Sequence, residues 1–424
     1  MRCLFFAQDY PITPDSVGGA PALTFSHLEL LAYAQAEIHL VLLSNPKKTL
    51  GFQEFTQSQP KVWEQIKSWC TSFQMIETLH EDTGRAPVKN FVRALQDPVQ
   101  YTCPDAHPRV LSTLKSVVAQ IRPEMIWAEH RIPAMLAQLA VPHVPIIYSF
   151  HDWEWRLGLL RHESRSNAMS GLKKLRSRFG VWQTRRAEHV TVSSVAACVS
   201  GSVTETAEFQ TIGAQRVAYF PTTYQPVDLR DVADATEPIR VVHLGAMQGT
   251  RNLISVQRFL DLSWFPSCIN HQAKPELWMV GSMKHAPDDF MVELKRAEAH
   301  CTGFVQDLST VLRPGDVHVV PWELPTGTRT RIPVALNHGQ ALVSTKAAAI
   351  CLPELKHNEN CLLVDDLSEM GVAIAELLNE PKRRKRIAQA GRDTFLKHFT
   401  RDSVQPRFER FVEDLKLSRA ASIY

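Results

Sequence analysis

Three places along the chain put glycine or small polar residues between a short apolar run and an amphipathic segment. They are Gly18-Gly19, the stretch that starts at Gly245, and Thr326-Gly327-Thr328. Glycines let backbone amides approach a ligand closely, and the start of a helix favours a negative charge. A plain turn or a capped helix start explains each place alone at least as well. Three such junctions in one chain together favour a site for a nucleotide diphosphate.

Two of these junctions also carry cations. Arg251 and Asn252 stand at the helix start expected after Gly245, and Arg329 and Arg331 follow Gly327. A guanidinium group can hold phosphate oxygens from the side opposite to the backbone amides. The alternative for each arginine is a surface residue surrounded by water.

His151 directly follows the apolar run 146–150. A polar residue at the carboxyl end of a parallel strand points to the edge where such sheets bind ligands. Histidine there could donate a hydrogen bond to a sugar hydroxyl or carry a proton. A histidine that is satisfied by loop carbonyls explains the position equally well.

Metal chemistry is not indicated. The acidic pairs Asp288-Asp289 and Asp365-Asp366 do not form a D-x-D motif, and solvated loop carboxylates explain them better. The eight cysteines stand singly with no C-x-x-C pair, which argues against a zinc site or a redox motif. We therefore expect free structural thiols in a reducing compartment.

The elements that must position these residues follow an alternating pattern of apolar runs and amphipathic segments, as in βαβ units with a parallel sheet. A helix is expected over about 20–34, and region 50–110 is expected to be helical insertion and loop. The expected strands are 3–7, 37–43, 125–128, 146–150 and 189–192 in the first half, and 240–244, 276–280, 317–320, 341–344 and 361–364 in the second.

The length of 424 residues fits two α/β domains, and 44% hydrophobic with 21% charged residues is normal for a folded chain. The polar stretch 226–238 is bounded by prolines and marks the boundary. We predict an N-terminal Rossmann-like domain over 1–226, a linker over 227–238, a C-terminal domain over 239–400 and a final helical segment over 401–424.

Charge and hydropathy limit which partners and which cellular location we expect for the protein. The net charge of +3 does not argue for nucleic acid, and no apolar run approaches the length of a membrane span. The apolar run 3–7 is too short for a secretory signal, so we expect a cytoplasmic protein.

A basic stretch over 161–186 carries an apolar stripe at helical spacing, with cations on the other side. The stripe consists of Leu172, Leu175, Phe179 and Trp182. Such a helix could lie on an anionic membrane at the inner face. A solvated helix face packed on its own domain is the slightly favoured alternative.

The order of these elements resembles family 4 of the GT-B glycosyltransferases over nearly the whole chain. The most specific match is 327–336, which is similar to the family's Gly-Thr-Arg-x-Lys-Ile-x-Glu-Ala segment; Gly18-Gly19, His151 and Arg251-Asn252 fall at other family positions. The resemblance implies an α/β fold with two Rossmann-like doubly wound domains that face a central cleft. The C-terminal helix over 401–424 would return to the N-terminal domain.

The resemblance also implies roles for residues. The donor diphosphate would lie between Gly18-Gly19, Arg251 and Arg331, and the base near Phe304 and Val305. His151 would be catalytic and would face the transferring sugar. Further donor-binding positions would be Asn252, Thr326, Gly327, Thr328 and Val334. No metal and no cofactor would be required, because cations and helix starts neutralise the leaving diphosphate.

One departure from the family pattern concerns the donor ribose. The family has two glutamates around this helix start, and their positions fall at Thr326 and Val334 here, with Glu323 out of register. Valine cannot accept a hydrogen bond from a hydroxyl, and an unpaired buried hydroxyl costs about 1–3 kcal/mol. The ribose is therefore held differently, or donor binding is weak, or catalysis is lost.

The function expected is that of a hexosyltransferase-type enzyme in polysaccharide biosynthesis. It would move a sugar from a nucleotide-diphosphate sugar to a glycan, lipid-linked or small-molecule acceptor, without metal and with retention of configuration. The alternatives are a degenerate GT-B-fold protein that binds a nucleotide or a partner without catalysis, and a GT-B enzyme of another type such as an epimerase or a phosphorylase.

Overall fold

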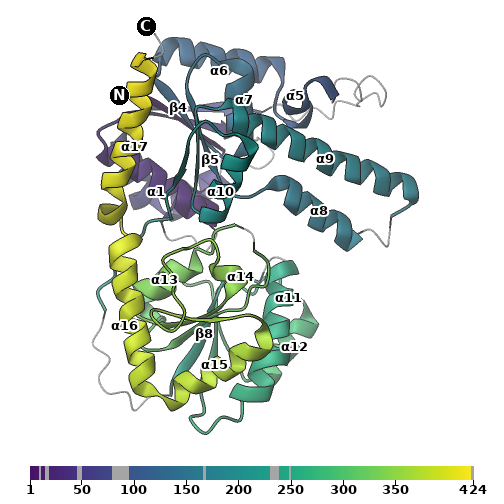
Figure 1. Cartoon of the computed structure of the whole chain (residues 1–424), viewed down its shortest axis with the longest axis vertical. Coiled ribbons are helices and arrows are strands. Elements are labelled where there is room, and N and C mark those ends of the chain that lie inside the picture. Colours follow the sequence, from purple (N-terminus) through teal and green to yellow (C-terminus); the bar gives the residue numbers. More distant parts are fainter. Residues whose placement is uncertain are drawn as a thin grey trace. The chain divides into compact units, whose positions relative to one another are not determined.

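The computed structural model describes residues 1–8, 11–14, 19–44, 50–78, 95–165, 169–229, 238–247, 250–325 and 327–421. The chain forms two compact units (Figure 1). Helices α1 (Gly19–Tyr33) and α17 (Arg401–Ala421) each have one end in the first unit and the other end in the second. The first unit is Met1–Thr13, His27–Phe220 and Phe411–Tyr424, and the second is Pro14–Ser26 and Pro221–Arg410. Of the linker expected over 227–238, residues 227–229 and 238 belong to the second unit, and residues 230–237 lie outside the described part.

The first unit is built on a seven-stranded parallel sheet in the order β3-β2-β1-β4-β5-β6-β7. Residues 3–7 of β1 are fully buried, which explains why this strand reads as a continuous apolar run. The strands are β1 (Arg2–Gln8), β2 (Glu37–Ser44), β3 (Cys70–Glu77), β4 (Met125–Glu129), β5 (Ile146–Phe150), β6 (Ala197–Ser200) and β7 (Val217–Tyr219).

Helices cover this sheet. Besides the shared α1 and α17, they are α2 (Leu50–Ser58), α3 (Pro60–Trp69), α5 (Pro98–Thr102), α6 (Pro108–Ile121), α7 (Arg131–Ala140), α8 (Glu154–Arg165), α9 (Gly171–Ser194) and α10 (Val203–Ile212). The end of α17 packs within the first unit, where Phe411 contacts Phe220 with ring centroids 5.4 Å apart and Arg216 donates a hydrogen bond to the Asp414 carbonyl (2.9 Å). This agrees with the returning C-terminal helix that the resemblance implied.

The strand expected over 189–192 was wrong, because these residues lie in α9. The local run His-Val-Thr-Val favours a strand, but the buried residues Ala187, Glu188, Thr191 and Val192 follow helical spacing. The actual strand is β6, which begins at Ala197.

Three further strands were missed, and each is at or near the edge of a sheet. β3 lies in region 50–110, where only helix and loop were expected, and β7 and β10 are the other two. Only one of the eight residues of β3 is buried, so it lacks the apolar run that reveals an interior strand. The other expected strands are confirmed to within two residues.

The second unit has a six-stranded parallel sheet in the order β10-β9-β8-β11-β12-β13, the order of a Rossmann sheet. Its strands are β8 (Arg240–Leu244), β9 (Glu276–Val280), β10 (His300–Gly303), β11 (Val317–Val320), β12 (Ala341–Thr345) and β13 (Leu362–Val364). Its helices are α11 (Thr250–Phe259), the π-helix η2 (Leu260–Cys268), α12 (Asp288–Arg296), the 3₁₀-helix η3 (Leu308–Thr310), α13 (Arg331–Asn337), α14 (Lys346–Ala349), α15 (Leu367–Asn379) and α16 (Pro381–His398).

Both faces of this second sheet are apolar. Val241 belongs to one buried cluster, and its neighbours Val242 and Leu244 belong to another. Because successive strand residues point to opposite faces, the two clusters lie on opposite sides of the sheet. Most strand positions are therefore apolar, and His243 of β8 and His318 of β11 are buried polar exceptions.

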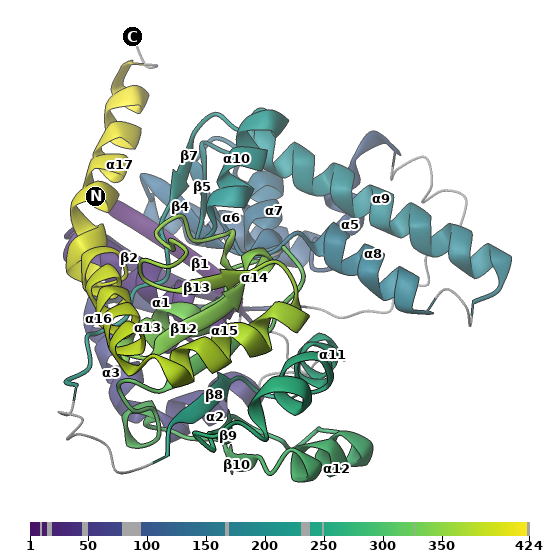
Figure 2. The same ribbon diagram turned by 60° about the horizontal axis from the view of Figure 1, so that its bottom comes forward.

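Helices α8 and α9 lie side by side and extend away from the sheet of the first unit (Figures 1 and 2). Buried Glu188 of α9 accepts hydrogen bonds from the backbone N–H groups of Glu154 and Trp155 at the start of α8 (3.0 and 3.1 Å). A carboxylate at this place satisfies donors that a helix leaves unpaired, so it anchors the pair of helices.

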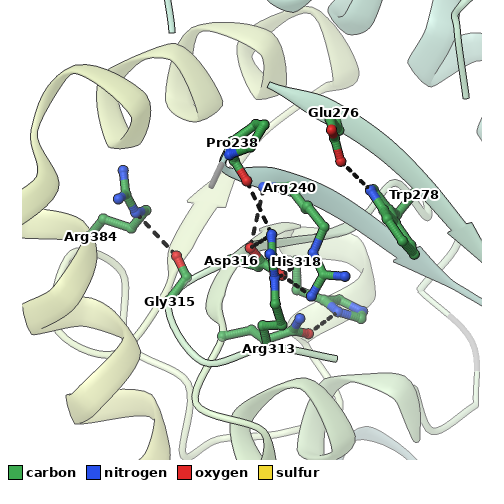
Figure 3. A network of polar contacts seen from close by, with 10 residues as sticks. Pro238, Arg240, Glu276, Trp278, Arg313, Gly315, Asp316, His318 and Arg384 are labelled. Atoms are coloured by element: carbon green, nitrogen blue, oxygen red, sulfur yellow. Dashed lines mark hydrogen bonds and ion pairs between the residues drawn. The ribbon is translucent and has the colours of Figure 1, made fainter. Parts of the chain in front are cut away.

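At the amino ends of the strands of the second sheet, a buried ion pair joins β8 to the turn before β11 (Figure 3). Asp316 accepts hydrogen bonds from Arg240 Nε (2.8 Å) and from Arg313 Nη2 (3.4 Å), and Arg240 also lies over the ring of Trp278. Burial raises the pKa of Asp316, although the two arginines oppose this shift. The pair is therefore costly to desolvate, and breaking it is costlier still.

We expect Asp316→Ala to lower the free energy of unfolding by about 3–5 kcal/mol, because it leaves Arg240 buried without its carboxylate. Urea unfolding followed by circular dichroism measures this change. The matched control is Asp365→Ala, which removes an exposed pair with Lys346 and should have little effect. Equal stability losses in the two variants would contradict the prediction.

Candidate functional site

Both sheets change strand order at one point, between β1 and β4 in the first unit and between β8 and β11 in the second. Ligands of open parallel sheets bind outside the carboxyl ends of the strands at such a point. Glu129 is the last residue of β4, and Gly245 directly follows β8. The candidate site residues of each unit are gathered around these two positions.

In the first unit, Glu129 is fully buried and accepts four hydrogen bonds. Oε1 accepts from Trp127 Nε1 (2.7 Å) and bonds His27 Nδ1 (2.8 Å). Oε2 accepts from Ser149 Oγ (2.8 Å) and bonds His151 Nε2 (2.8 Å). The expected residue His151 is thus tied to a carboxylate that comes from the neighbouring strand.

The electrostatics of this cluster favour an ionised carboxylate. Burial alone would raise the pKa of Glu129, but the charge of His27 and the hydrogen bonds from His151 and His27 outweigh it, so the pKa lies well below its ordinary value. The ring of His130 stacks on that of His151 with centroids 3.6 Å apart. Burial, together with the charge of His151, lowers the pKa of His130 well below its ordinary value.

In the second unit, two glycines allow the ends of β8 and β9 to approach each other. Gly245 has φ +153° and Gly281 has φ +137°, and a Cβ atom on Gly281 would lie 2.6 Å from the carbonyl oxygen of Gly245. A Cβ atom on Gly245 would lie 3.1 Å from the guanidinium of Arg331. Glycine here lets backbone and guanidinium come close together.

Arg331 begins α13 and lies beside the turn after β8. Its Nη1 donates to His243 Nε2 (3.3 Å), and its Nη2 donates to Asn252 Oδ1 (3.4 Å). Asn252 in turn donates to the carbonyl of Ala246 (3.1 Å). The expected site residues Asn252 and Arg331 are therefore brought together with Gly245.

No carboxylate of the described residues lies within ion-pair distance of Arg331. Burial, helped by the charge of Arg329, lowers the pKa of Arg331 to about 9, although part of the residue remains accessible. The pKa of the neighbouring His243 is also lowered well below its ordinary value, by burial and by the charge of Arg331. This place is electropositive and partly desolvated, and its cation has no carboxylate partner among the described residues, so its charge favours an anion.

The remaining expected residues are distributed around this place. Gly19 lies near α13, because a Cβ atom on it would be 3.5 Å from Thr330 and 3.8 Å from the carbonyl of Thr328. Gly327 precedes these residues with φ +61°. Arg251 is partly exposed in the first turn of α11 and forms no ion pair with a described residue. Gly18 and Thr326 lie outside the described residues.

The expected base-binding residues follow β10. Phe304 is 72% exposed, and Val305 packs against a buried apolar cluster. Gly281 donates a backbone hydrogen bond to Gly303 (3.1 Å), which connects this strand end to the glycines described above. Val334, one helical turn after Arg331, is a buried member of the same apolar cluster.

The sequence interpretation did not identify Glu129, His27, His130 and His243. Glu129 and His130 follow an apolar strand in the same way as His151, so the rule that singled out His151 could have found them. His27 lies inside α1 and His243 inside β8, where nothing in the local sequence marks them as site residues.

Comparisons with known proteins agree with this picture. Residues 238–380 match the family model of glycosyl transferases group 1. The chain is similar in structure to HepE from Anabaena, solved with UDP and glucose (TM-score 0.65, 11% identity, 98% of this chain and 100% of that one). It is also similar to sucrose-phosphate synthase from Thermosynechococcus elongatus (TM-score 0.66, 12% identity, 98% and 99%).

A third similar structure is that of TarM (TM-score 0.65, 7% identity, 96% of this chain and 97% of that one). No protein of curated function matches the sequence. These likenesses give the fold: two Rossmann-like units of the GT-B class, as the resemblance implied.

We expect Arg331→Met to raise the melting temperature of the ligand-free protein by about 1–2 °C. The variant replaces a shielded cation that has no carboxylate partner with an uncharged chain of similar length, a gain of roughly 1–2 kcal/mol. The matched control is Arg258→Met, which removes an exposed arginine paired with Glu323 and should give no increase. A fall in the melting temperature of the Arg331 variant, measured by calorimetry, would contradict the expectation.

Proposed function

We propose that this chain, with its GT-B fold and its group 1 glycosyl transferase region over 238–380, transfers a hexose from a nucleotide-diphosphate sugar to an acceptor. The acceptor is a glycan, a lipid-linked sugar or a small molecule, and the context is polysaccharide biosynthesis. The single observation that carries the proposal is the guanidinium of Arg331 beside Gly245, which has no carboxylate partner among the described residues.

An unpaired, partly desolvated cation destabilises the free protein, and a bound diphosphate would supply the missing negative charge. Gly245 lets the backbone lie directly beside the guanidinium of Arg331, and Asn252 supplies a further polar group. Arg251, Gly18-Gly19 and the segment from Thr326 to Thr328 extend the site in this proposal. Exposed Phe304 offers its ring to the base, with Val305 beneath it.

Transfer is proposed to be metal-independent and to retain the configuration at the anomeric carbon, as in family 4. Arg331 and backbone amides would stabilise the charge that develops on the leaving diphosphate, so no metal or other cofactor is required. His151 is the catalytic residue that contacts the transferring sugar. Activity that persists in EDTA and an α-linked product from an α-linked donor are the outcomes that this mechanism requires.

The alternative is a protein that binds a nucleotide or a partner without catalysis. It is motivated by Val334, a buried apolar residue where family 4 has a glutamate. Because valine offers no acceptor, the ribose would have to be held by backbone groups or by another side chain. Both proposals predict that the protein binds a nucleotide, and only the first predicts that it transfers a sugar.

We expect UDP, the nucleotide in the HepE structures, to bind to the protein in a calorimetric titration. Arg331→Met should weaken this binding by at least about tenfold, because it removes a charge-assisted contact worth roughly 1.5–3 kcal/mol. The matched control is Arg258→Met, which should bind as the wild type does.

Failure of UDP and of the other common nucleoside diphosphates to bind would overturn the proposal. Binding of UDP without release of UDP from any UDP-sugar in the presence of acceptor extracts would favour the protein without catalysis.

We also propose a peripheral contact with an anionic membrane at the inner face, through the segment 161–186 of a cytoplasmic protein. No helix of the described residues is long and apolar enough to cross a bilayer. The contact would be made by α9, where Leu172 is 80% exposed and Leu175 is 68% exposed. The stripe that the sequence interpretation expected to pack on its own domain is thus open at these two positions.

Cations flank the exposed leucines on the same helix. Lys173, Arg176 and Arg178 are exposed beside Leu172 and Leu175, and Trp182 is exposed two turns further along. Exposed leucines next to cations match the apolar interior and the anionic headgroups of a bilayer. A membrane-bound acceptor would then be close to the enzyme.

We expect the protein to co-sediment with vesicles that contain phosphatidylglycerol and not with vesicles of phosphatidylcholine alone. The double variant Leu172→Ser/Leu175→Ser should bind at least about tenfold more weakly, because two apolar side chains no longer enter the bilayer. The matched control is Leu417→Ser, at a leucine of α17 that is 70% exposed. Equal binding by the double variant and the control would contradict the membrane contact.

A further inference from the structure

His243 is the residue before the last one of β8, and its buried side chain contacts the guanidinium group of Arg331. We propose that His243 is the positioning residue for Arg331: as a neutral hydrogen-bond acceptor, it fixes the orientation of the guanidinium group without cancelling its positive charge. This role rests on the proposed function only in assigning a diphosphate to Arg331.

The direction of the contact follows from the hydrogens that each group carries. A guanidinium group has five N–H donors and no acceptor. Arg331 Nη1 lies 3.3 Å from His243 Nε2, so this ring nitrogen must present a lone pair to the arginine. The ring hydrogen is then on Nδ1, and the ring is neutral, because an imidazolium carries hydrogen on both nitrogens. The geometry therefore defines both the tautomer and the charge of His243.

The surroundings of His243 agree with a neutral ring. Burial, followed by the charge of Arg331, lowers the pKa of His243 well below its ordinary value, and the backbone of Val319 opposes this shift only in part. His318 on the neighbouring strand β11 acts in the same direction as Arg331. His318 itself bonds Gln340 Oε1 through Nδ1 (2.8 Å), and burial lowers its pKa to about 4. Both histidines are thus neutral near neutral pH.

Two further contacts complete the orientation of the guanidinium group. A Cβ atom on Gly245 would lie 3.1 Å from Nη2 and 3.2 Å from Cζ and Nη1 of Arg331, so the face of the group lies against this glycine. Nη2 donates to Asn252 Oδ1 (3.4 Å), and the amide of Asn252 is itself held by the Ala246 carbonyl (3.1 Å). The described residues thus use two of the five N–H groups, and both acceptors are neutral.

Histidine meets two requirements at this position of β8. A carboxylate would pair with Arg331 and cancel the charge that a diphosphate needs. An apolar side chain, such as Val241, Val242 or Leu244 of the same strand, would leave an N–H group without its acceptor and the guanidinium group free to turn. A neutral imidazole supplies the acceptor and keeps the positive charge.

A purely structural role for His243 would give a different result. The ring would then only fill space beside β8, and substitutions of similar size and polarity would affect UDP binding to a similar degree. The test therefore compares variants that keep or remove an acceptor at the position of Nε2.

The first test uses the full chain and measures UDP binding by calorimetric titration. Glutamine at position 243 can place its amide oxygen where Nε2 lies, whereas asparagine reaches only to the position of Nδ1. We expect His243→Asn to weaken binding by at least about fivefold, because Arg331 loses an acceptor, and His243→Gln to bind within about twofold of the wild type. Wild-type affinity in His243→Asn, or equal losses in the two variants, would overturn the role of His243.

The variant His243→Glu tests the requirement for a neutral acceptor. It keeps an acceptor beside Arg331 but supplies an internal anion. We expect UDP binding to fall by at least about tenfold, because the diphosphate must compete with a carboxylate that is already paired. The melting temperature should be no lower than that of His243→Asn, since Arg331 gains a partner. Binding as tight as in the wild type would contradict the inference.

The second readout does not depend on ligand binding. Nitrogen-15 spectra of the histidine-labelled wild type report which ring nitrogens carry hydrogen. The His243 signals are assigned through His243→Gln or, where this variant does not fold, through Arg331→Met. We expect hydrogen on Nδ1 and none on Nε2 near neutral pH. The His243 signals should change in Arg331→Met, whereas those of His27 in the first unit should not.

The two proposals can fail separately. Hydrogen on Nε2 of His243, alone or together with Nδ1, would overturn the inference even in an enzyme that transfers a sugar. The expected spectra in a protein that binds no nucleoside diphosphate would support the role of His243 toward Arg331 and contradict the proposed function.

Discussion

A strand in the interior of a parallel sheet with helices on both sides is buried on both faces, so apolar residues fill most of its positions and a ligand can reach it only at its ends. The fully buried residues 3–7 of β1 and the two apolar clusters that flank β8 show this constraint in both units. The carboxyl ends of the strands therefore hold the candidate site residues, and the points where the strand order changes decide which of them meet.

The two units differ in the charge at their strand ends: the first has a buried carboxylate, and the second has a partly buried guanidinium. In the first unit, the carboxylate of Glu129 has four hydrogen-bond donors and a counter-charge close by, so the cluster is complete without a ligand. In the second unit, the partners that the described residues give Arg331 are neutral, His243 and Asn252. A cluster whose charges are paired is stable by itself, whereas a shielded cation without a carboxylate partner is destabilising until an anion binds.

Val334 offers no carboxylate that could pair with Arg331. The two residues lie three positions apart in α13, which places them on the same side of the helix. A glutamate at this position, as family 4 has, could pair with the arginine as well as accept a ribose hydroxyl. With valine there, the apolar cluster includes this turn of the helix, and α13 offers no carboxylate beside the arginine.

The sequence by itself determined the interior strands of both sheets except β6, because an interior strand such as 146–150 needs an apolar residue at nearly every position and the chain shows this directly. It also indicated Gly245, Asn252 and Arg331, since glycine and arginine next to strand ends are local signals. The edge strand β3 and the helical assignment of 189–192 were decided by tertiary packing, because partial exposure or a helical neighbourhood outweighed the local pattern. Glu129 and His27 are separated by 102 positions, and only the fold brings a helix and a strand so close that one buried carboxylate must satisfy both. Local residue patterns cannot show such a pairing, because its energy arises only when both groups leave water together.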